Sequence, residues 1–172
     1  MRIEDWDDLH AMVVDAGHEL LANVGLPATY AGRLPRGDVR WAETLSIIGL
    51  AGNLRGSLVL SIPSTLVRRS HPTGGTDHDA LADWLAELAN LMLGGIKVRL
   101  LSRDVTIELS TPLTISATTF RVARFVGTPV VHAFQCETDT ICFVFEAVSH
   151  ERAILAADRI PAAVKSGEMI TF

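Results

Sequence analysis

The stretch from residue 77 to residue 97 constrains the fold more than any other part of the chain, because it reads as one long helix. Ala and Leu fill its interior, which favours helix, and acidic residues crowd its first turn, where the helix dipole stabilises negative charge. Thr76 and Asp79 have the spacing of a capping box. Gly94 and Gly95 are typical of a helix end. We therefore predict a helix over residues 77–97.

The central turns of this helix carry an unusual polar stripe. Asp83, Glu87 and Asn90 stand at i, i+4 and i+7, so that at about 100° per residue they share one narrow face, which Gly94 continues. The stripe has no basic residue, whereas a solvated helix face usually mixes Lys and Arg with Glu. Two interpretations stay open, an ordinary solvent-facing stripe or a rigid display of Glu87 and Asn90 to a partner. The other faces are apolar and are predicted to be buried on both flanks, through Trp84, Leu85, Leu88, Leu91 and Met92.

Composition limits the classes of function. At 172 residues the chain suits one domain with its own core, and a hydrophobic fraction of 48% argues against disorder. The net charge of −5 gives no basic footprint, so nucleic acid and anionic membrane are not expected partners. No apolar run reaches transmembrane length and the acidic N-terminus does not resemble a signal peptide, so a cytoplasmic location is expected. Cys136 and Cys142 are predicted to be buried, reduced thiols.

The first half of the chain predicts a helix, a loop and a hairpin. Residues 3–24 have apolar positions three to four apart and form an amphipathic helix that ends at Gly25. Residues 26–40 read as a loop that is either solvated or in contact with an acidic partner, because it contains Arg33, Arg36 and Arg40. Residues 43–51 and 55–62 read as paired strands that are joined by a turn at Gly52-Asn53, and a short helical turn follows at Pro63-Ser64-Thr65.

The second half predicts a run of strands, over residues 103–110, 112–118, 129–136 and 140–148. The last two form an antiparallel hairpin by loop length, with Asp139 and Thr140 at the turn. This order of elements indicates an α+β fold, and the whole chain, residues 1–172, is predicted to be a single domain. Residues 150–172 are predicted to be a loosely attached C-terminal tail that could include one short helix.

Histidine and cysteine chemistry is not indicated. His10 and His18 are predicted to lie at the surface or its boundary, and His132 on a sheet face without a catalytic partner. The chain shows no Ser–His–Asp set and no Cys–His pair. One group could be drawn as a metal cluster, but its spacing is not a recognised one and a solvated loop is the better interpretation: His71, Asp77, His78 and Asp79.

The polar stripe resembles the signature helix of the CheC/CheX/FliY phosphatases of bacterial chemotaxis. That signature is Asp or Ser, then Glu, then Asn at the spacing of Asp83, Glu87 and Asn90, with a Pro somewhat more than twenty residues later. Pro112 lies 22 positions after Asn90 (112 − 90). The Gly-rich hairpin at residues 45–63 also resembles the paired strands of the family. The likeness spans roughly residues 40–150 and is closest to the CheX type, because there is one signature helix.

The resemblance implies a fold and an activity. It implies long helices packed on one face of a mostly antiparallel sheet, and hydrolysis of the aspartyl phosphate on a CheY-like receiver domain. Asn90 would orient the attacking water, Glu87 would pair with the receiver's Lys, and Asp83 would make a peripheral contact or brace the helix, with Gly94 and Pro112 as further binding positions. The only cofactor expected is Mg²⁺ held by the receiver, not by this chain. The resemblance also suggests a homodimer, and a non-catalytic signalling adaptor stays open as the alternative function.

Overall fold

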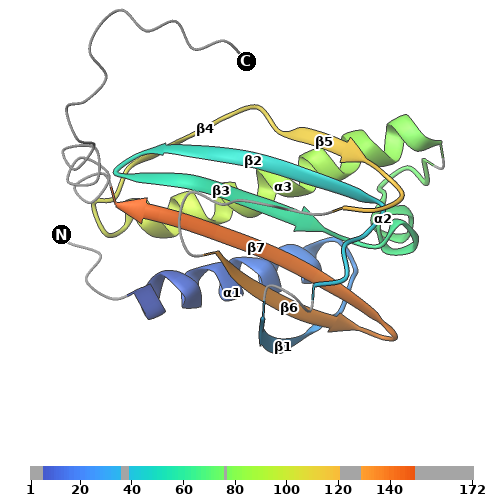
Figure 1. The fold of residues 1–172 in the computed structure, drawn as a ribbon, viewed down its shortest axis with the longest axis horizontal. Coiled ribbons are helices and arrows are strands. Elements are labelled where there is room, and N and C mark those ends of the chain that lie inside the picture. The colour runs from blue at the N-terminus through green and yellow to red at the C-terminus, as the bar shows by residue number, and fades with distance from the viewer. Residues whose placement is uncertain (1–5, 36–38, 76, 121–128, 150–172) are drawn as a thin grey trace, which may run out of the picture.

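The computed structural model describes residues 6–35, 39–75, 77–120 and 129–149. In these residues three helices and seven strands alternate in an α+β order (Figure 1). The helices are α1 (Trp6–Asn23), α2 (Ser64–Ser70) and α3 (His78–Leu101). The strands are β1 (Thr29–Leu34), β2 (Thr44–Gly52), β3 (Leu54–Ser61), β4 (Ile107–Leu109), β5 (Leu113–Ser116), β6 (Val130–Cys136) and β7 (Asp139–Ser149).

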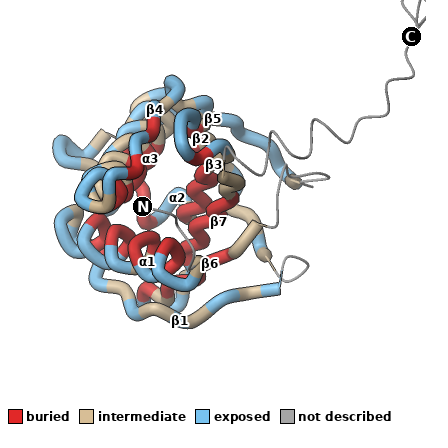
Figure 2. The backbone as a smooth tube through the Cα atoms, turned by 90° about the vertical axis from the view of Figure 1, so that its left-hand side faces the viewer, coloured by how far each residue is buried: buried red, intermediate tan, exposed pale blue. Residues whose placement is uncertain are grey.

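The strands form one sheet in the order β1-β6-β7-β3-β2-β4, with β5 paired to β2 beside β4. Every pairing is antiparallel. The long helices α1 and α3 lie together on one face of this sheet, as Figures 1 and 2 show. The predicted fold class is therefore confirmed. Among the described helices, none is both long and apolar enough to cross a membrane.

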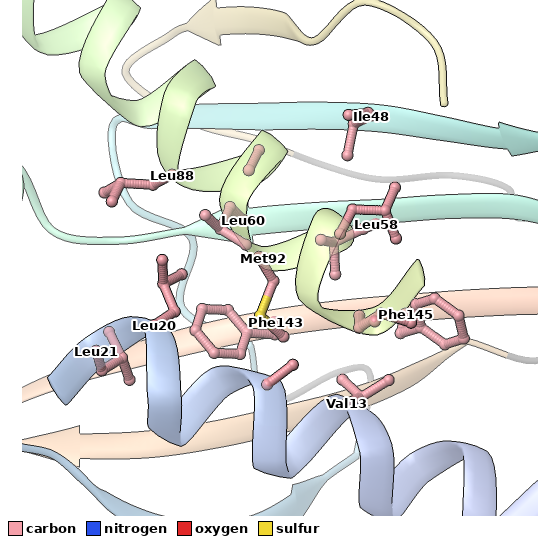
Figure 3. Packing of buried hydrophobic residues seen from close by; sticks show 14 of the residues in the cluster. Val13, Leu20, Leu21, Ile48, Leu58, Leu60, Leu88, Met92, Phe143 and Phe145 are labelled. Carbon is pink, nitrogen blue, oxygen red and sulfur yellow. The ribbon is translucent and has the colours of Figure 1, made fainter. Parts of the chain in front are cut away.

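The main core lies between the sheet and the two long helices. Met92 of α3 points toward Phe143 of β7, while Val13 and Leu20 of α1 approach the same layer (Figure 3). Their burial is close to complete, with Met92 and Phe143 at 0% exposure. Because buried apolar area is the main favourable term in folding, this layer fixes both helices on the sheet.

A second, smaller cluster covers the opposite face of the sheet. Both cysteines are free and buried, as predicted, and Cys142 belongs to this cluster, where burial raises the pKa of its thiol to about 11. At that pKa the thiol stays protonated and unreactive at neutral pH. The buried residues of the cluster are Leu45, Val59, Val131, Cys142 and Val144.

The predicted hairpin is confirmed as β2 and β3. Gly52 adopts a φ of +113° at the turn, in the region that favours glycine, and the Asn53 side-chain oxygen accepts a hydrogen bond of 2.8 Å from the Thr106 amide. Gly56 is required for a different reason: a Cβ there would overlap the Glu146 carbonyl oxygen of the neighbouring strand. The helix predicted over residues 3–24 is confirmed from Trp6 onward.

The prediction of a loop over residues 26–40 was wrong in part, because β1 occupies Thr29–Leu34. This strand lies at the sheet edge and alternates between exposed and half-buried residues, so its sequence lacks the apolar run of a central strand. Its pairing with β6 is irregular between Tyr30 and Gly32. Arg33 forms an ion pair of 2.9 Å with Asp7 of α1, and its side chain stays 49% exposed.

Three other boundaries also differ from prediction. Helix α3 continues through Gly94 and Gly95 to Leu101, and its N-cap is Asp77, whose carboxylate accepts a hydrogen bond of 2.8 Å from the Ala80 amide. The turn between β6 and β7 lies at residues 137–138, so that Asp139 and Thr140 belong to β7. The strands predicted at 103–110 and 112–118 shorten to β4 and β5. The predicted helix in the tail falls in residues 150–172, outside the described residues.

Candidate functional site

Helix α3 is held rigidly by one wide buried face. Three hydrogen bonds add to the apolar contacts: Trp84 Nε1 donates to Ser70 Oγ at 3.0 Å, and Thr114 Oγ1 donates to the Ala82 carbonyl at 3.3 Å. Arg99 donates to Glu19 of α1 at 2.6 Å, on the exposed side of the α1–α3 contact. The buried residues of α3 are Leu85, Leu88, Ala89, Met92, Leu93, Ile96 and Leu100.

The structure places the predicted polar stripe on the outer face of α3. Asp83 and Glu87 are exposed and Asn90 is half-buried. Within the described part of the chain, none of the three makes a hydrogen bond or ion pair. Three polar side chains are thus presented on a rigid element with their hydrogen-bonding capacity unused by this chain. An ordinary solvated helix face would pair such groups with Lys or Arg one turn away.

Gly94 and Pro112 occupy different places relative to the stripe. Gly94 continues it on α3, and a Cβ at this position would have no atom within 4 Å. Pro112 is not on the helix but lies half-buried between β4 and β5 at the sheet edge. It stands two residues before Thr114, whose side chain reaches the Ala82 carbonyl of α3. The structure therefore brings Pro112 to the strand beside the helix, and not into the stripe itself.

The prediction that Leu91 is buried was wrong. Its side chain is 47% exposed, and two more apolar side chains of α3 share its exposure, Val98 at 68% and Leu101 at 57%. The sequence pattern placed Leu91 on a buried flank, but the stripe faces outward along the whole helix and Leu91 borders it. The exposed face of α3 is thus polar in its first half, and its second half carries these exposed apolar side chains beside the half-buried Lys97.

The chemistry open to the stripe is positioning and not acid–base catalysis by Asn. A carboxamide does not titrate, so Asn90 can only donate and accept hydrogen bonds, while Glu87 offers a carboxylate to a cation or a donor. In the described residues no three His, Cys, Asp or Glu side chains gather as a metal site. Two of the four loop residues that could be drawn as a metal cluster have other roles, since Asp77 caps α3 and the His71 ring packs on the Trp84 ring at 5.7 Å between centroids.

A hollow of about 540 Å³ lies on the other flank of α3, between α2 and the ends of β2 and β5. Its floor is apolar, with Ile62, Val67 and Leu85, and Arg68 and His78 stand among its polar lining residues. None of the stripe residues lines it. The hollow is therefore separate from the candidate site, and no sequence pattern indicated it because its lining comes from four separate stretches of the sequence.

A buried cluster of histidines corrects one further prediction, that for His10. His10 of α1 is only 9% exposed and not at the surface, and its Nδ1 lies 3.1 Å from Nε2 of His132, which is fully buried. Tyr30 of β1 lies 3.1 Å from the other ring nitrogen of His132, so both nitrogens of that ring have partners. His18 is exposed as predicted. The cluster links α1, β1 and β6, and none of its members belongs to α3.

This histidine cluster makes the fold sensitive to acid. Burial, followed by the charges of His10 and Arg33, lowers the pKa of His132 from 6.5 to about 4. Burial also lowers the pKa of His10. A histidine whose pKa is lowered by folding stabilises the fold above its unfolded pKa of 6.5 and loses that contribution as the pH falls toward 4.

We therefore expect the free energy of unfolding to fall by about 2 kcal/mol between pH 7 and pH 5 through His132. Urea unfolding at several pH values checks this. The difference between pH 7 and pH 5 should shrink in a His132→Gln variant and stay as in the wild type in a His18→Gln variant, because His18 is exposed. An unchanged difference in His132→Gln would contradict the assignment.

Comparison with known proteins agrees with this architecture. The family model described as chemotaxis phosphatase CheX matches residues 44–135, which include the hairpin, the whole of α3 and Pro112. No curated protein sequence matches the chain. Among solved structures, chemotaxis protein CheX from Desulfovibrio desulfuricans has a TM-score of 0.72 at 15% identity, over 82% of this chain and 99% of that one.

Two further structures give the same fold. CheX from Vibrio vulnificus has a TM-score of 0.70 at 16% identity, over 80% of this chain and 97% of that one. The CheX in a CheX–CheY–BeF3–Mg²⁺ complex from Borrelia burgdorferi has a TM-score of 0.65 at 16% identity, over 82% of this chain and 96% of that one. The family model covers more than half of the sequence. The chain therefore belongs to the CheX family of chemotaxis phosphatases.

Proposed function

We propose that this protein hydrolyses the aspartyl phosphate of a CheY-like receiver domain, with Asn90 and Glu87 as the residues that act on it. The observation that carries the proposal is the pair itself: a half-buried carboxamide and an exposed carboxylate, one turn apart on a rigid helix and without partners in the described residues. The family description as chemotaxis phosphatase and the existence of a CheX–CheY–BeF3–Mg²⁺ complex in Borrelia burgdorferi support a receiver as the substrate.

In this proposal Asn90 positions the nucleophile. Its carboxamide oxygen accepts a hydrogen bond from a water and its NH₂ group donates to a phosphoryl oxygen, so that the water oxygen faces phosphorus in line with the leaving carboxylate. The water oxygen bonds to phosphorus as the bond from phosphorus to the receiver's Asp oxygen breaks. Both water protons stay with the orthophosphate that is released, and the Asp leaves as a free carboxylate. Phosphoryl transfer rewards such positioning because it asks for little covalent chemistry from the protein.

Glu87 fixes the docking geometry in this proposal. Its exposed carboxylate pairs with the Lys of the receiver's phosphorylation site through a charge-assisted hydrogen bond. Asp83, one turn earlier on the same face, makes a peripheral polar contact. The Mg²⁺ that offsets phosphoryl charge comes with the receiver as part of the substrate.

A panel of receiver domains from the source organism tests the proposal. Each receiver is phosphorylated by a small-molecule phosphodonor, and loss of the acid-labile phosphate is followed with and without this protein. We expect faster loss from at least one receiver. If a receiver binds the protein but none loses phosphate faster, the protein is a non-catalytic adaptor and the phosphatase proposal is wrong.

A further inference from the structure

The second half of the α3 outer face carries three exposed apolar side chains, beside the half-buried Lys97, that the chemistry of the stripe does not explain. We call Leu91, Val98 and Leu101 the apolar extension. At about 100° per residue Leu101 falls between Glu87 and Asn90 around the helix, and Val98 and Leu91 lie about 20° and about 40° beyond Glu87. Their side chains are between 47% and 68% exposed. Single exposed apolar residues are ordinary on a protein surface, but a row of three on one helix face is not.

Gly94 stands in the middle of this face and has no structural reason to be glycine. A glycine inside a helix is less favourable than Ala by about 1 kcal/mol. A Cβ at Gly94 would meet nothing within 4 Å, and the residue has no positive φ, so neither close packing nor backbone conformation requires a glycine here. Gly95 contrasts with it, since a Cβ there would lie 3.6 Å from the Ala16 side chain, at the α1 contact. The bare helix surface at Gly94 suits the close approach of another molecule's main chain.

Distance places the apolar extension under any receiver that reaches Asn90. At 1.5 Å per residue, Val98 lies about 12 Å and Leu101 about 16 Å from Asn90 along the helix axis. A standard interface buries about 800 Å² on each partner, which is a patch roughly 30 Å wide. A receiver centred on Asn90 therefore covers Leu91, Gly94 and Val98 and reaches Leu101.

We propose that the apolar extension and Gly94 form the half of the receiver-docking surface that determines affinity. In the complex, an apolar surface of the receiver, next to its phosphorylation site, covers them. This inference rests on the proposed function for the identity of the partner. It separates two roles along one helix: the polar half acts on the phosphate, and the apolar half holds the receiver while it does so. This chain is acidic and so is a receiver's phosphorylation site, so charge attraction does not bring the two together. Burial of apolar side chains supplies affinity that does not depend on charge.

A second copy of this chain is the competing occupant. Leu91 directly follows Asn90 on the helix, so a dimer seated on the apolar extension would cover Asn90 and close the candidate site. The receiver is the occupant that uses both halves of the face together.

The test uses the full chain and beryllofluoride-loaded receivers with Mg²⁺, and measures the dissociation constant separately from phosphate loss. A Val98→Gln/Leu101→Gln variant keeps helix-forming residues and removes the apolar surface. We expect the dissociation constant for the responding receiver to rise about tenfold. The KM for the phosphorylated receiver should rise similarly, with kcat unchanged. The control is Leu113→Gln on β5, which is 59% exposed and pairs with Ile47 on the helix-free face of the sheet.

A second pair of variants tests Gly94 independently. Gly94→Leu should raise Tm by about 2–4 °C, because Leu favours helix and has open space, yet should weaken receiver binding about tenfold or more. Gly95→Ala should also favour the helix and leave binding unchanged, because this residue faces α1. If Gly94 had only a structural role, replacing it would lower stability and binding together. A rise in Tm with a loss of receiver binding therefore assigns Gly94 to the docking surface.

The outcomes separate the two proposals. Binding and kinetics that are unchanged in both Val98→Gln/Leu101→Gln and Gly94→Leu, on a receiver that the wild type dephosphorylates, overturn the apolar docking surface and leave the phosphatase intact. Weakened binding without any phosphatase activity in the wild type supports the docking surface and overturns the phosphatase. Conversion of a dimer to a monomer by the double variant, with receiver binding unchanged, assigns the surface to a second copy and overturns the inference. A panel in which no receiver binds the wild type overturns both.

Discussion

Asn90→Ala is expected to abolish phosphatase activity while leaving the fold and receiver binding nearly intact. Asn90 is half-buried and makes no hydrogen bond within the described part of the chain, so its removal costs the fold little. Removing one group that positions or stabilises the reacting atoms costs about 100-fold or more in kcat. We therefore expect kcat to fall by at least about 100-fold, and the dissociation constant for a beryllofluoride-loaded receiver to change by no more than about threefold.

An isosteric variant sharpens the interpretation of this result. Asn90→Asp keeps the shape of the side chain but replaces the NH₂ donor with a carboxylate oxygen next to a phosphoryl group. It should lose activity as Asn90→Ala does, and also bind the loaded receiver more weakly because like charges repel. Retention of wild-type kcat in Asn90→Ala, from a protein with unchanged Tm, would show that Asn90 does not position the water.

Glu87→Ala is expected to weaken receiver binding and to lower the rate at subsaturating receiver. The carboxylate is exposed and unpaired in the described residues, so the free energy of unfolding should change little. A charge-assisted hydrogen bond across an interface contributes about 1.5–3 kcal/mol, which makes a tenfold or greater rise in the dissociation constant the expected result. Fluorescence anisotropy of a labelled, beryllofluoride-loaded receiver measures it.

Two further variants separate the charge of Glu87 from net charge and from shape. Glu108→Ala removes the same charge from an exposed position on β4, outside α3, and should leave binding unchanged. Glu87→Gln keeps the shape and loses only the charge, and it should bind nearly as weakly as Glu87→Ala. Wild-type affinity in Glu87→Ala would mean that this residue does not pair with the receiver's Lys.

The central elements of the fold could be predicted because their residues carry strong periodic signals. The β2–β3 hairpin follows from alternation on either side of Gly52-Asn53, and α3 from its Ala- and Leu-rich interior. Strand β1 could not be predicted, because its hydrogen bonds come from β6, about a hundred residues later, and its own sequence has no apolar run. An edge strand takes its conformation from its neighbour more than from its own sequence.

The end of α3 shows how tertiary packing overrides local propensity. Gly94 and Gly95 are typical of a helix end, yet Ile96 and Leu100 are fully buried in the main core and continue the helix for two more turns. The local signal was a glycine pair, and the deciding contacts lie in α1 and the sheet. The same limit applies to Leu91, whose exposure depends on which way the helix is turned.

The candidate site was predictable to the extent that it lies on one helix. Asp83, Glu87 and Asn90 share a face because of helix geometry alone, and the structure confirms that this face is outward. The His10–His132 pair was not predictable, since 122 residues separate its members and no motif links them. The hollow between α2 and α3 was hidden in the same way. Sites within one element can be predicted from sequence, whereas sites assembled across the sheet require the fold.

The most direct test of the central claim is the release of free orthophosphate from a phosphorylated, responsive receiver, with this protein present well below the receiver concentration. We predict that each molecule of the protein releases many phosphates, that the protein itself acquires no label, and that Asn90→Ala releases phosphate no faster than the receiver alone. Equal release by wild type and Asn90→Ala, or transfer of label onto this chain, would contradict a phosphatase that works by positioning water from α3.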